Sequence, residues 1–123
     1  MLKGLLVTLA LIGLVGVCVP PTRAQERYLG FVPLGFCALS SMSAATGLSS
    51  CSGGIPTGTT YIVACAYVAG IVWRDDGTNP TGTPGSGGQG IAANSCLPYW
   101  GTPSAMKFIQ QSTGALLGVS FYR

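Results

Sequence analysis

Hydrophobic residues along the chain recur at every second position in short runs rather than at helical spacing, and this pattern predicts β-strands. The clearest run covers residues 60–74, TYIVACAYVAGIVWR. The alternate positions expected to share one face of this strand are Ile62, Ala64, Ala66 and Val68. Gly70 lies inside the run and predicts a bulge or bend that divides it into two strands.

Four other segments show weaker strand patterns. One strand is expected within residues 28–39, where Pro33 favours an edge position because proline donates no hydrogen bond to a neighbouring strand. The others are expected at residues 91–100, 105–111 and 114–123, and the last places Leu117, Val119 and Phe121 on one face.

Segments rich in glycine and serine separate these runs. Residues 40–58 are expected to form a loop, residues 78–90 a flexible connection, and residues 112–114 a hairpin loop. Six or seven short strands then follow one another without a linker or a repeat. The pattern predicts an all-β fold, namely a small antiparallel β-sandwich or a partly open barrel.

The N-terminus has the pattern of a secretory signal peptide, comprising residues 1–24. Lys3 precedes an apolar run over residues 5–19, and small residues around Ala24 fit a cleavage site before Gln25. The run is shorter than the roughly 20 apolar residues of a membrane-spanning helix. A lipoprotein anchored through Cys18 is an alternative. The sequence thus predicts one β-sandwich domain over residues 25–123, exported to the periplasm or the medium or carried on a virion.

Cleavage at this site would leave a nearly neutral domain. Its four basic side chains and three acidic ones give a net charge of +1; they are Arg27, Arg74, Lys107, Arg123, Glu26, Asp75 and Asp76. A domain of this charge has no electrostatic footprint for nucleic acid or for anionic lipid. We therefore expect no nucleic-acid partner, and membrane contact only through an uncleaved N-terminal segment.

Four cysteines remain in the predicted domain: Cys37, Cys51, Cys65 and Cys96. An even number in an exported chain of this size favours two disulfides, in any of three connectivities. A structural zinc site normally has ligands two to four residues apart, whereas the separations here are 14, 14 and 31, and the chain has no histidine. Free buried thiols are the third interpretation.

Two of the three acidic residues lie in the motif WRDDGT. Arg74, Asp75, Asp76 and Gly77 are typical of a tight turn, because glycine accepts a positive φ and aspartate bonds its own backbone. A calcium loop is the alternative, but the regularly spaced oxygen ligands and distant glutamate of an EF-hand are not in this sequence. We interpret the motif as a turn, with Arg74 able to pair with an aspartate.

Little in this sequence favours catalysis. There is no histidine, and Glu26 lies at the predicted N-terminus of the domain. Adjacent aspartates on a strand point to opposite faces, so they do not form a glycosidase pair. The glycine-rich residues 82–90 are not followed by the Lys-Ser/Thr of a phosphate-binding loop. We predict no catalytic residues, no metal and no cofactor.

Aromatic residues supply the candidate binding surface. Tyr99 and Trp100, in the segment LPYWGTP, could form an exposed patch. Packing of these rings in the core is the alternative explanation.

Two segments resemble small structural proteins of tailed bacteriophages and prophages. The segments are IPTGTTYIVACAYVAGIVWRDDGTNPT and SAMKFIQQSTGALLGVSFYR, similar to a pattern IPxGATY…VRWRDDGTxPT…AIKFIQ…AKLNVSYYR. The match covers about 70 residues and includes the ending Val119–Arg123; the WRDDGT turn (Trp73–Thr78) and the KFIQ strand (Lys107–Gln110) are distinctive together and weak separately.

The resemblance implies a small β-sandwich that forms part of a virion or decorates it, without catalysis. The predicted signal peptide and the four cysteines depart from the pattern. They suggest a relative that is exported. We expect a protein partner or self-association on a particle; the alternative function is an exported adhesion module that binds a glycan or a peptide.

Overall fold

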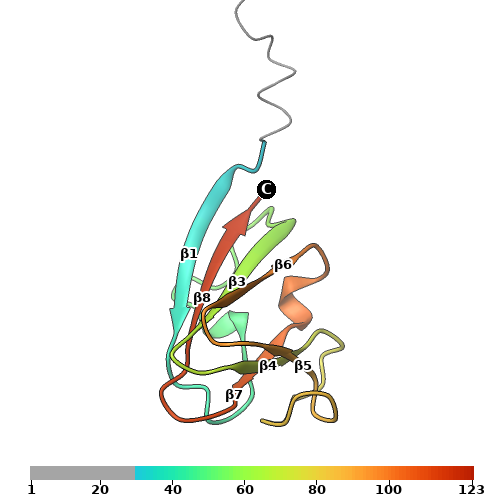
Figure 1. The fold of residues 1–123 in the computed structure, drawn as a ribbon. Helices are drawn as coiled ribbons and strands as arrows, with labels where there is room; N and C mark the ends of the chain where they lie inside the picture. The colour runs from blue at the N-terminus through green and yellow to red at the C-terminus, as the bar shows by residue number, and fades with distance from the viewer. Residues whose placement is uncertain (1–29) are drawn as a thin grey trace, which may run out of the picture. The chain divides into compact units, whose positions relative to one another are not determined.

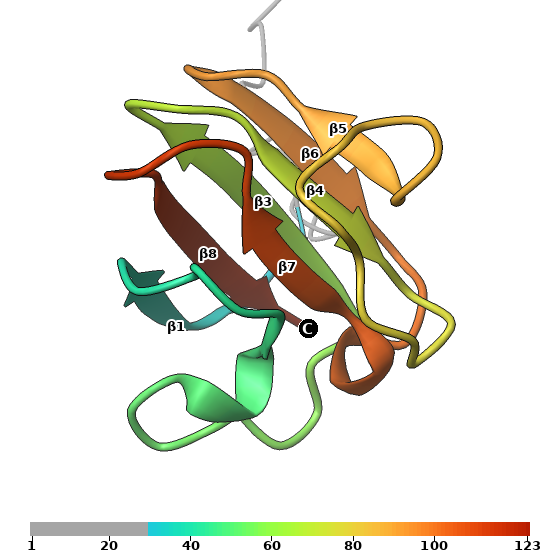
Figure 2. The ribbon, with the colours of Figure 1, turned by 90° about the horizontal axis from the view of Figure 1, so that it is seen from below.

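The computed structural model describes residues 30–123, which form two antiparallel four-stranded sheets that pack as an unclosed sandwich (Figures 1 and 2). The first sheet has the order β1 (Pro33–Leu39), β8 (Leu116–Tyr122), β3 (Tyr61–Tyr67) and β6 (Ser95–Tyr99). The second sheet has the order β2 (Thr46–Gly47), β7 (Lys107–Gln110), β4 (Ile71–Arg74) and β5 (Gln89–Ile91). Two single-turn 3₁₀ helices, η1 (Leu48–Ser50) and η2 (Pro103–Ala105), complete the described elements. The predicted all-β sandwich is confirmed.

The core lies between the two sheets and is built from the alternating positions that the sequence indicated. On β8, Leu117, Val119 and Phe121 are at most 1 % exposed, and on β3 Ile62, Ala64 and Ala66 are fully buried. The second sheet contributes Ile71, Trp73 and Phe108 to the same cluster. Because side chains alternate across a strand, this arrangement directs the intervening residues of β3 and β8 away from the core.

Gly70 divides the longest predicted strand as expected, but the two halves belong to different sheets. β3 lies in the first sheet and β4 in the second, and residues 68–70 carry the chain between them. The prediction that Val68 shares a face with the alternate residues from Ile62 to Ala66 is wrong: those residues are fully buried, whereas Val68 is 70 % exposed. It has left the strand, with a positive φ of 70°.

Two of the other connections that pass between the sheets correct two predictions. The single strand expected at residues 91–100 is two strands, because a turn at Asn94 (φ 61°) separates β5 in the second sheet from β6 in the first. Residues 112–114 are not a hairpin loop. They join β7 and β8, which pair with other strands in different sheets. The residues described thus contain eight strands rather than six or seven.

The expected edge position of the first strand is confirmed, since β1 pairs only with β8. The pairing register shifts between Pro33 and Gly35, which marks an irregularity where the strand begins. Residues 40–58, expected to be a loop, contain β2 and η1.

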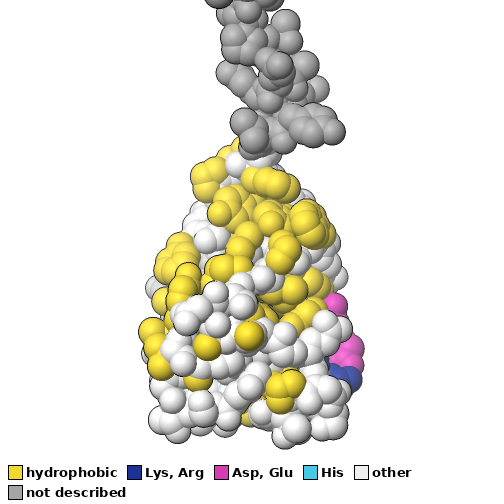
Figure 3. Space-filling model, viewed as in Figure 1, with side chains coloured by type: hydrophobic (Ala, Val, Ile, Leu, Met, Phe, Trp, Pro, Cys, Tyr) yellow, Lys and Arg dark blue, Asp and Glu magenta, His cyan; other side chains and the backbone are white. Residues whose placement is uncertain are grey.

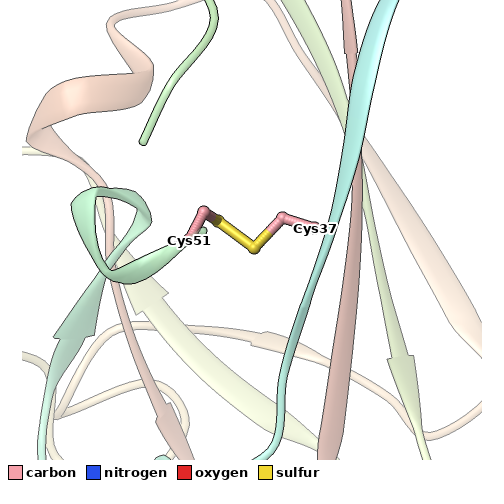
Figure 4. The surroundings of a disulfide bond; sticks show 2 residues. All are labelled: Cys37 and Cys51. Carbon is pink, nitrogen blue, oxygen red and sulfur yellow. A yellow bond between two sulfur atoms is a disulfide. The ribbon is translucent and has the colours of Figure 1, made fainter. Parts of the chain in front are cut away.

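Both expected disulfides form. Cys37 on β1 is bonded to Cys51 directly after η1, with 5.6 Å between the Cα atoms, and Figure 4 shows this bond joining the strand to the helical turn. Both residues are buried. Cys65 on β3 is bonded to Cys96 on β6, and these two residues are directly paired across the first sheet. Two disulfides in so small a domain indicate an oxidising, non-cytoplasmic environment.

The connection between β4 and β5 packs against the outer side of the second sheet. Val72 faces that side and is fully buried. A methyl group placed on Gly88 would lie 2.9 Å from the Val72 side chain, and one on Gly82 would lie 3.3 Å from the carbonyl oxygen of Gln110 on β7. The glycines therefore let this connection lie close to the sheet that it covers.

The predicted signal peptide, residues 1–24, lies outside the described residues. Within residues 30–123, no helix has the length and apolar character needed to cross a membrane.

Candidate functional site

The WRDDGT motif forms a local turn after β4 that is held by side-chain hydrogen bonds. Arg74 pairs with Asp76, whose Oδ1 also accepts hydrogen bonds from the Thr78 amide at 3.1 Å and from the Thr78 hydroxyl at 2.6 Å. Gly77 follows with a φ of 77°. These hydrogen bonds, above all those from Arg74, hold the pKa of Asp76 well below its usual range. The turn opens the long connection to β5 and is not itself a two-residue hairpin.

Asp75, the neighbouring aspartate of this turn, is held by Tyr99 on β6. The Tyr99 hydroxyl donates to Asp75 Oδ2 at 3.1 Å and accepts a hydrogen bond from the Thr102 amide at 2.9 Å. The ring also contacts Trp73 edge to face, with centroids 5.9 Å apart. Partial burial, and next the hydrogen bond to Asp75, raise the pKa of Tyr99. Tyr99 therefore connects β6 to the turn and packs against the core.

An open cleft of about 580 Å³ lies beside the turn. It is lined by Trp73, Arg74, the two aspartates, Gly85 and residues 88–90. Both carboxylates already accept hydrogen bonds from side chains of the chain itself. No group of three or more histidine, cysteine, aspartate or glutamate side chains within residues 30–123 could hold a metal ion. The arrangement is that of a turn stabilised by its own side chains.

Replacing Asp76 by asparagine tests this role through pH. Because the pKa of Asp76 is lower in the folded chain than its ordinary value of about 3.9, the unfolded chain binds more protons as the pH falls below that value. The stabilisation by the carboxylate is thus present above about pH 4 and declines towards about pH 2. At neutral pH we expect the melting temperature of wild type to be higher than that of Asp76→Asn. This difference in melting temperature should disappear as the pH is lowered towards about 2.

Arg74→Gln is the matched variant for this experiment, because it removes the other partner of the pair. The melting temperature of Arg74→Gln should also approach that of wild type as the pH is lowered. The double variant should have about the same melting temperature as either single variant. A gap between wild type and Asp76→Asn that stays constant down to pH 2 would contradict the assignment of the pair.

The largest exposed feature lies elsewhere, on the side of the first sheet that points away from the second. We call this surface the outer face and define it by the rows that the strand register places side by side. One row comprises Phe36, Ser120, Val63 and Pro98. The next comprises Ala38, Gly118, Cys65 and Cys96, and the rows at either end add Tyr61 with Tyr122 and Tyr67 with Leu116.

Two aromatic rings lie over the glycine in the middle of this face. A methyl group placed on Gly118 would be 3.2 Å from the ring of Tyr67 and 3.3 Å from that of Phe36. The two rings come from β3 and β1, on either side of β8. Phe36 is nevertheless 69 % exposed. Because Gly118 has no side chain, the rings of Tyr67 and Phe36 can lie directly against its backbone.

A row of stacked rings lies at one end of the outer face. Tyr61 stacks on Phe31 with centroids 4.5 Å apart and on Trp100 with centroids 4.6 Å apart, and Tyr122 lies 5.6 Å from Tyr61. Trp100 is 64 % exposed. Of the two aromatic residues predicted to form a binding patch, the structure thus exposes Trp100, whereas the Tyr99 ring packs inward.

The outer face carries none of the described charged side chains. Arg74, Asp75 and Asp76 lie at the end of β4, Lys107 is on β7, and the side chain of Arg123 lies beside Gly58. Figure 3 shows hydrophobic side chains across much of the visible surface, whereas the charged ones in this view lie together at one edge.

The comparisons with known proteins give no assignment. No protein-family model matches the chain, and neither the curated proteins nor the solved structures contain a significant match.

Proposed function

We propose that this protein is a non-catalytic structural or decoration component of a phage virion and that it acts by packing against other protein. The observation that carries the proposal is the outer face. Seven large hydrophobic side chains among the described residues are between 40 % and 70 % exposed, and six of them, all except Val32, lie on this face or at its ends. An apolar surface of this extent is typical of an interaction site.

The position of the resembling motifs supports the same proposal. WRDDGT begins on β4 and KFIQ is β7, and these strands pair directly, with Trp73 opposite Phe108 and Arg74 opposite Lys107. The two motifs that are distinctive together therefore form one structural unit. Disulfides are compatible with this proposal because virion surfaces are among the oxidising environments in which they persist.

A second candidate is an exported adhesion module, which the stacked rings favour. Trp100 presents an exposed ring beside Tyr61, and aromatic rings of this kind stack on apolar ligand surfaces. In that case, glycan or peptide binding would be lost in Trp100→Ala while the melting temperature stayed unchanged.

Mass spectrometry of purified phage particles and of the cell envelope from the source organism tests the proposal. The samples are kept non-reduced, and the N-terminal peptide is identified in each. We expect many copies per particle, with both disulfides intact. Peptides found in the envelope or the medium, and none in particles, would contradict a virion role and favour the adhesion module.

A further inference from the structure

The first sheet is apolar on both sides, unlike most antiparallel sheets that have one face in water. Ile62, Ala64 and Ala66 face the core, and the alternate residues of β3 on the outer face are Tyr61, Val63, Cys65 and Tyr67. A half-exposed strand normally alternates apolar with polar residues, whereas a strand buried on both sides is a continuous apolar run. The composition of β3 is therefore that of a strand covered on both faces.

The two sheets differ in what covers them. On the second sheet, the β4–β5 connection packs over Val72 and buries it completely. On the first sheet, Phe36, Tyr67 and Trp100 remain between 46 % and 69 % exposed, so residues 30–123 provide no equivalent cover. An exposed apolar face of this extent is typical of a surface that another molecule covers.

The size of the outer face matches half of a stable dimer interface. Its exposed hydrophobic side chains present on the order of 600 Å², taking roughly 150–250 Å² for a whole aromatic side chain and less for Val68 and Leu116. A standard interface takes about 800 Å² from each partner. The lack of described charges on this face means that two copies of it can meet without repulsion between like charges.

The chemistry of the face favours protein over a membrane as its partner. Proteins that lie on anionic membranes flank their apolar surface with lysine and arginine. Of the three described basic residues, Arg74 and Lys107 belong to the second sheet, and Arg123 follows β8 with its side chain beside Gly58. The aromatic side chains on the outer face are those enriched in protein interfaces.

The edges of the first sheet are poorly suited to strand pairing, which leaves its face as the contact surface. β6 is one edge strand and contains Pro98, and β1 is the other and has the register shift after Pro33. Proline and irregular pairing are devices that prevent edge-to-edge association.

Val68 provides an independent observation at the rim of the face. It occupies a γ-turn in which the Ala69 amide donates to the Tyr67 carbonyl oxygen at 2.8 Å, with φ of 70° at Val68. This turn is rare and strained, above all for a β-branched residue. The Val68 side chain is also 70 % exposed. Strained backbone of this kind is concentrated at functional sites, so an exposed valine here suggests a contact outside the domain.

We propose that two copies of this chain associate through their outer faces, with the two first sheets packed face to face. This inference rests on the proposed packing function and names the partner surface. Two such sheets would lie about 10 Å apart with their side chains interdigitated, as the layers of a sandwich do. Because the same patch serves both copies, the contact is isologous and gives a closed dimer.

Sedimentation equilibrium of the oxidised full chain over a wide range of concentrations tests the dimer. We expect a monomer–dimer equilibrium in the micromolar range or tighter. Phe36→Arg and Ser120→Arg each place a charge on the outer face, and each should raise the Kd by about 30-fold or more, as for an interface hot spot. Ser86→Arg is the matched control, since it adds the same charge on the exposed β4–β5 connection, and its Kd should stay at the wild-type value.

Val68→Asn adds a test that merely weakened folding cannot mimic. Asparagine tolerates a positive φ, so the variant should melt a few degrees above wild type when both are monomeric. It should at the same time dimerise more weakly. Circular dichroism of every variant confirms that the fold is kept.

Three results would overturn the proposal. The first is a wild-type chain that is still monomeric at high micromolar concentration, and the second is equal Kd values for Phe36→Arg and Ser86→Arg. The third is flotation of wild type, but not of Phe36→Arg, with vesicles of phosphatidylethanolamine and phosphatidylglycerol. The first two exclude this dimer, and the third assigns the face to lipid. None depends on whether the chain is found in particles. A monomer recovered from virions would refute only the dimer, whereas a dimer found only in the envelope would refute only the virion role.

Discussion

Replacing Phe121 by alanine is expected to lower the free energy of unfolding by about 3–5 kcal/mol, the largest effect of any single substitution proposed for this protein. Phe121 lies on β8, between β1 and β3, and is only 1 % exposed. Its ring faces the second sheet across the core. Truncation would remove buried apolar surface and leave a cavity that two sheets joined through several connections cannot easily close.

Phe36→Ala is the matched control, because it removes the same side chain from the neighbouring strand on the opposite face. Phe36 is 69 % exposed, so its loss should change the free energy of unfolding by only about 0.5 kcal/mol. Both variants are unfolded with urea at the lowest workable protein concentration, so that dimer dissociation does not contribute to the measured free energy. Similar losses for the two variants would mean that the assignment of inner and outer faces is wrong.

Removing a single disulfide is expected to have the second-largest effect, and removing both bonds a larger one still. The Cys37–Cys51 bond closes a loop of 14 residues and the Cys65–Cys96 bond one of 31. Chain entropy then predicts about 3 kcal/mol for the first bond and about 3.5 kcal/mol for the second. The two loops do not overlap, so the losses should add to roughly 6–7 kcal/mol, which is comparable with the total stability of a small domain.

The location of each bond suggests a further difference. Cys37 and Cys51 are buried beneath β1, so Cys37→Ala/Cys51→Ala also leaves unfilled space in the core. Cys65 and Cys96 lie on the outer face, where alanine leaves no enclosed cavity. We expect each double variant to melt well below wild type, and the chain lacking both bonds to be largely unfolded at 37 °C. Unchanged melting of the fully reduced chain would contradict this expectation.

The strands were predictable from sequence where apolar residues alternate within a single strand. The alternation around Leu117 and Ile62 is a local property, and it correctly grouped Leu117, Val119 and Phe121 on one face of β8 and Ile62, Ala64 and Ala66 on one face of β3; the structure shows both of these faces to be buried. What could not be predicted was which sheet each strand joins. The turn at Asn94 divides one apolar run between two sheets, and residues 112–114 connect strands that never pair. Both outcomes depend on partners distant in the sequence.

The candidate sites show the same division. Four cysteines predicted two disulfides, but their pairing depends on the register that brings Cys65 opposite Cys96. The WRDDGT turn was predictable because its hydrogen bonds lie within four residues. The outer face was not identified from sequence. Its one local signal was the continuous apolar run of β3, which indicates burial on both sides without showing that one side lacks a cover.

The sequence by itself determined the all-β class, the division of the longest run at Gly70, the cysteines available for bonding and the local turn after β4. Each of these follows from propensities and spacings within about ten residues. Only the tertiary structure decided the sheet order, the disulfide pairing and the exposure of Trp100 and Phe36 beside a buried Phe121. The physical reason is that two faces of one strand can be equally apolar, and long-range packing alone decides which of them is buried.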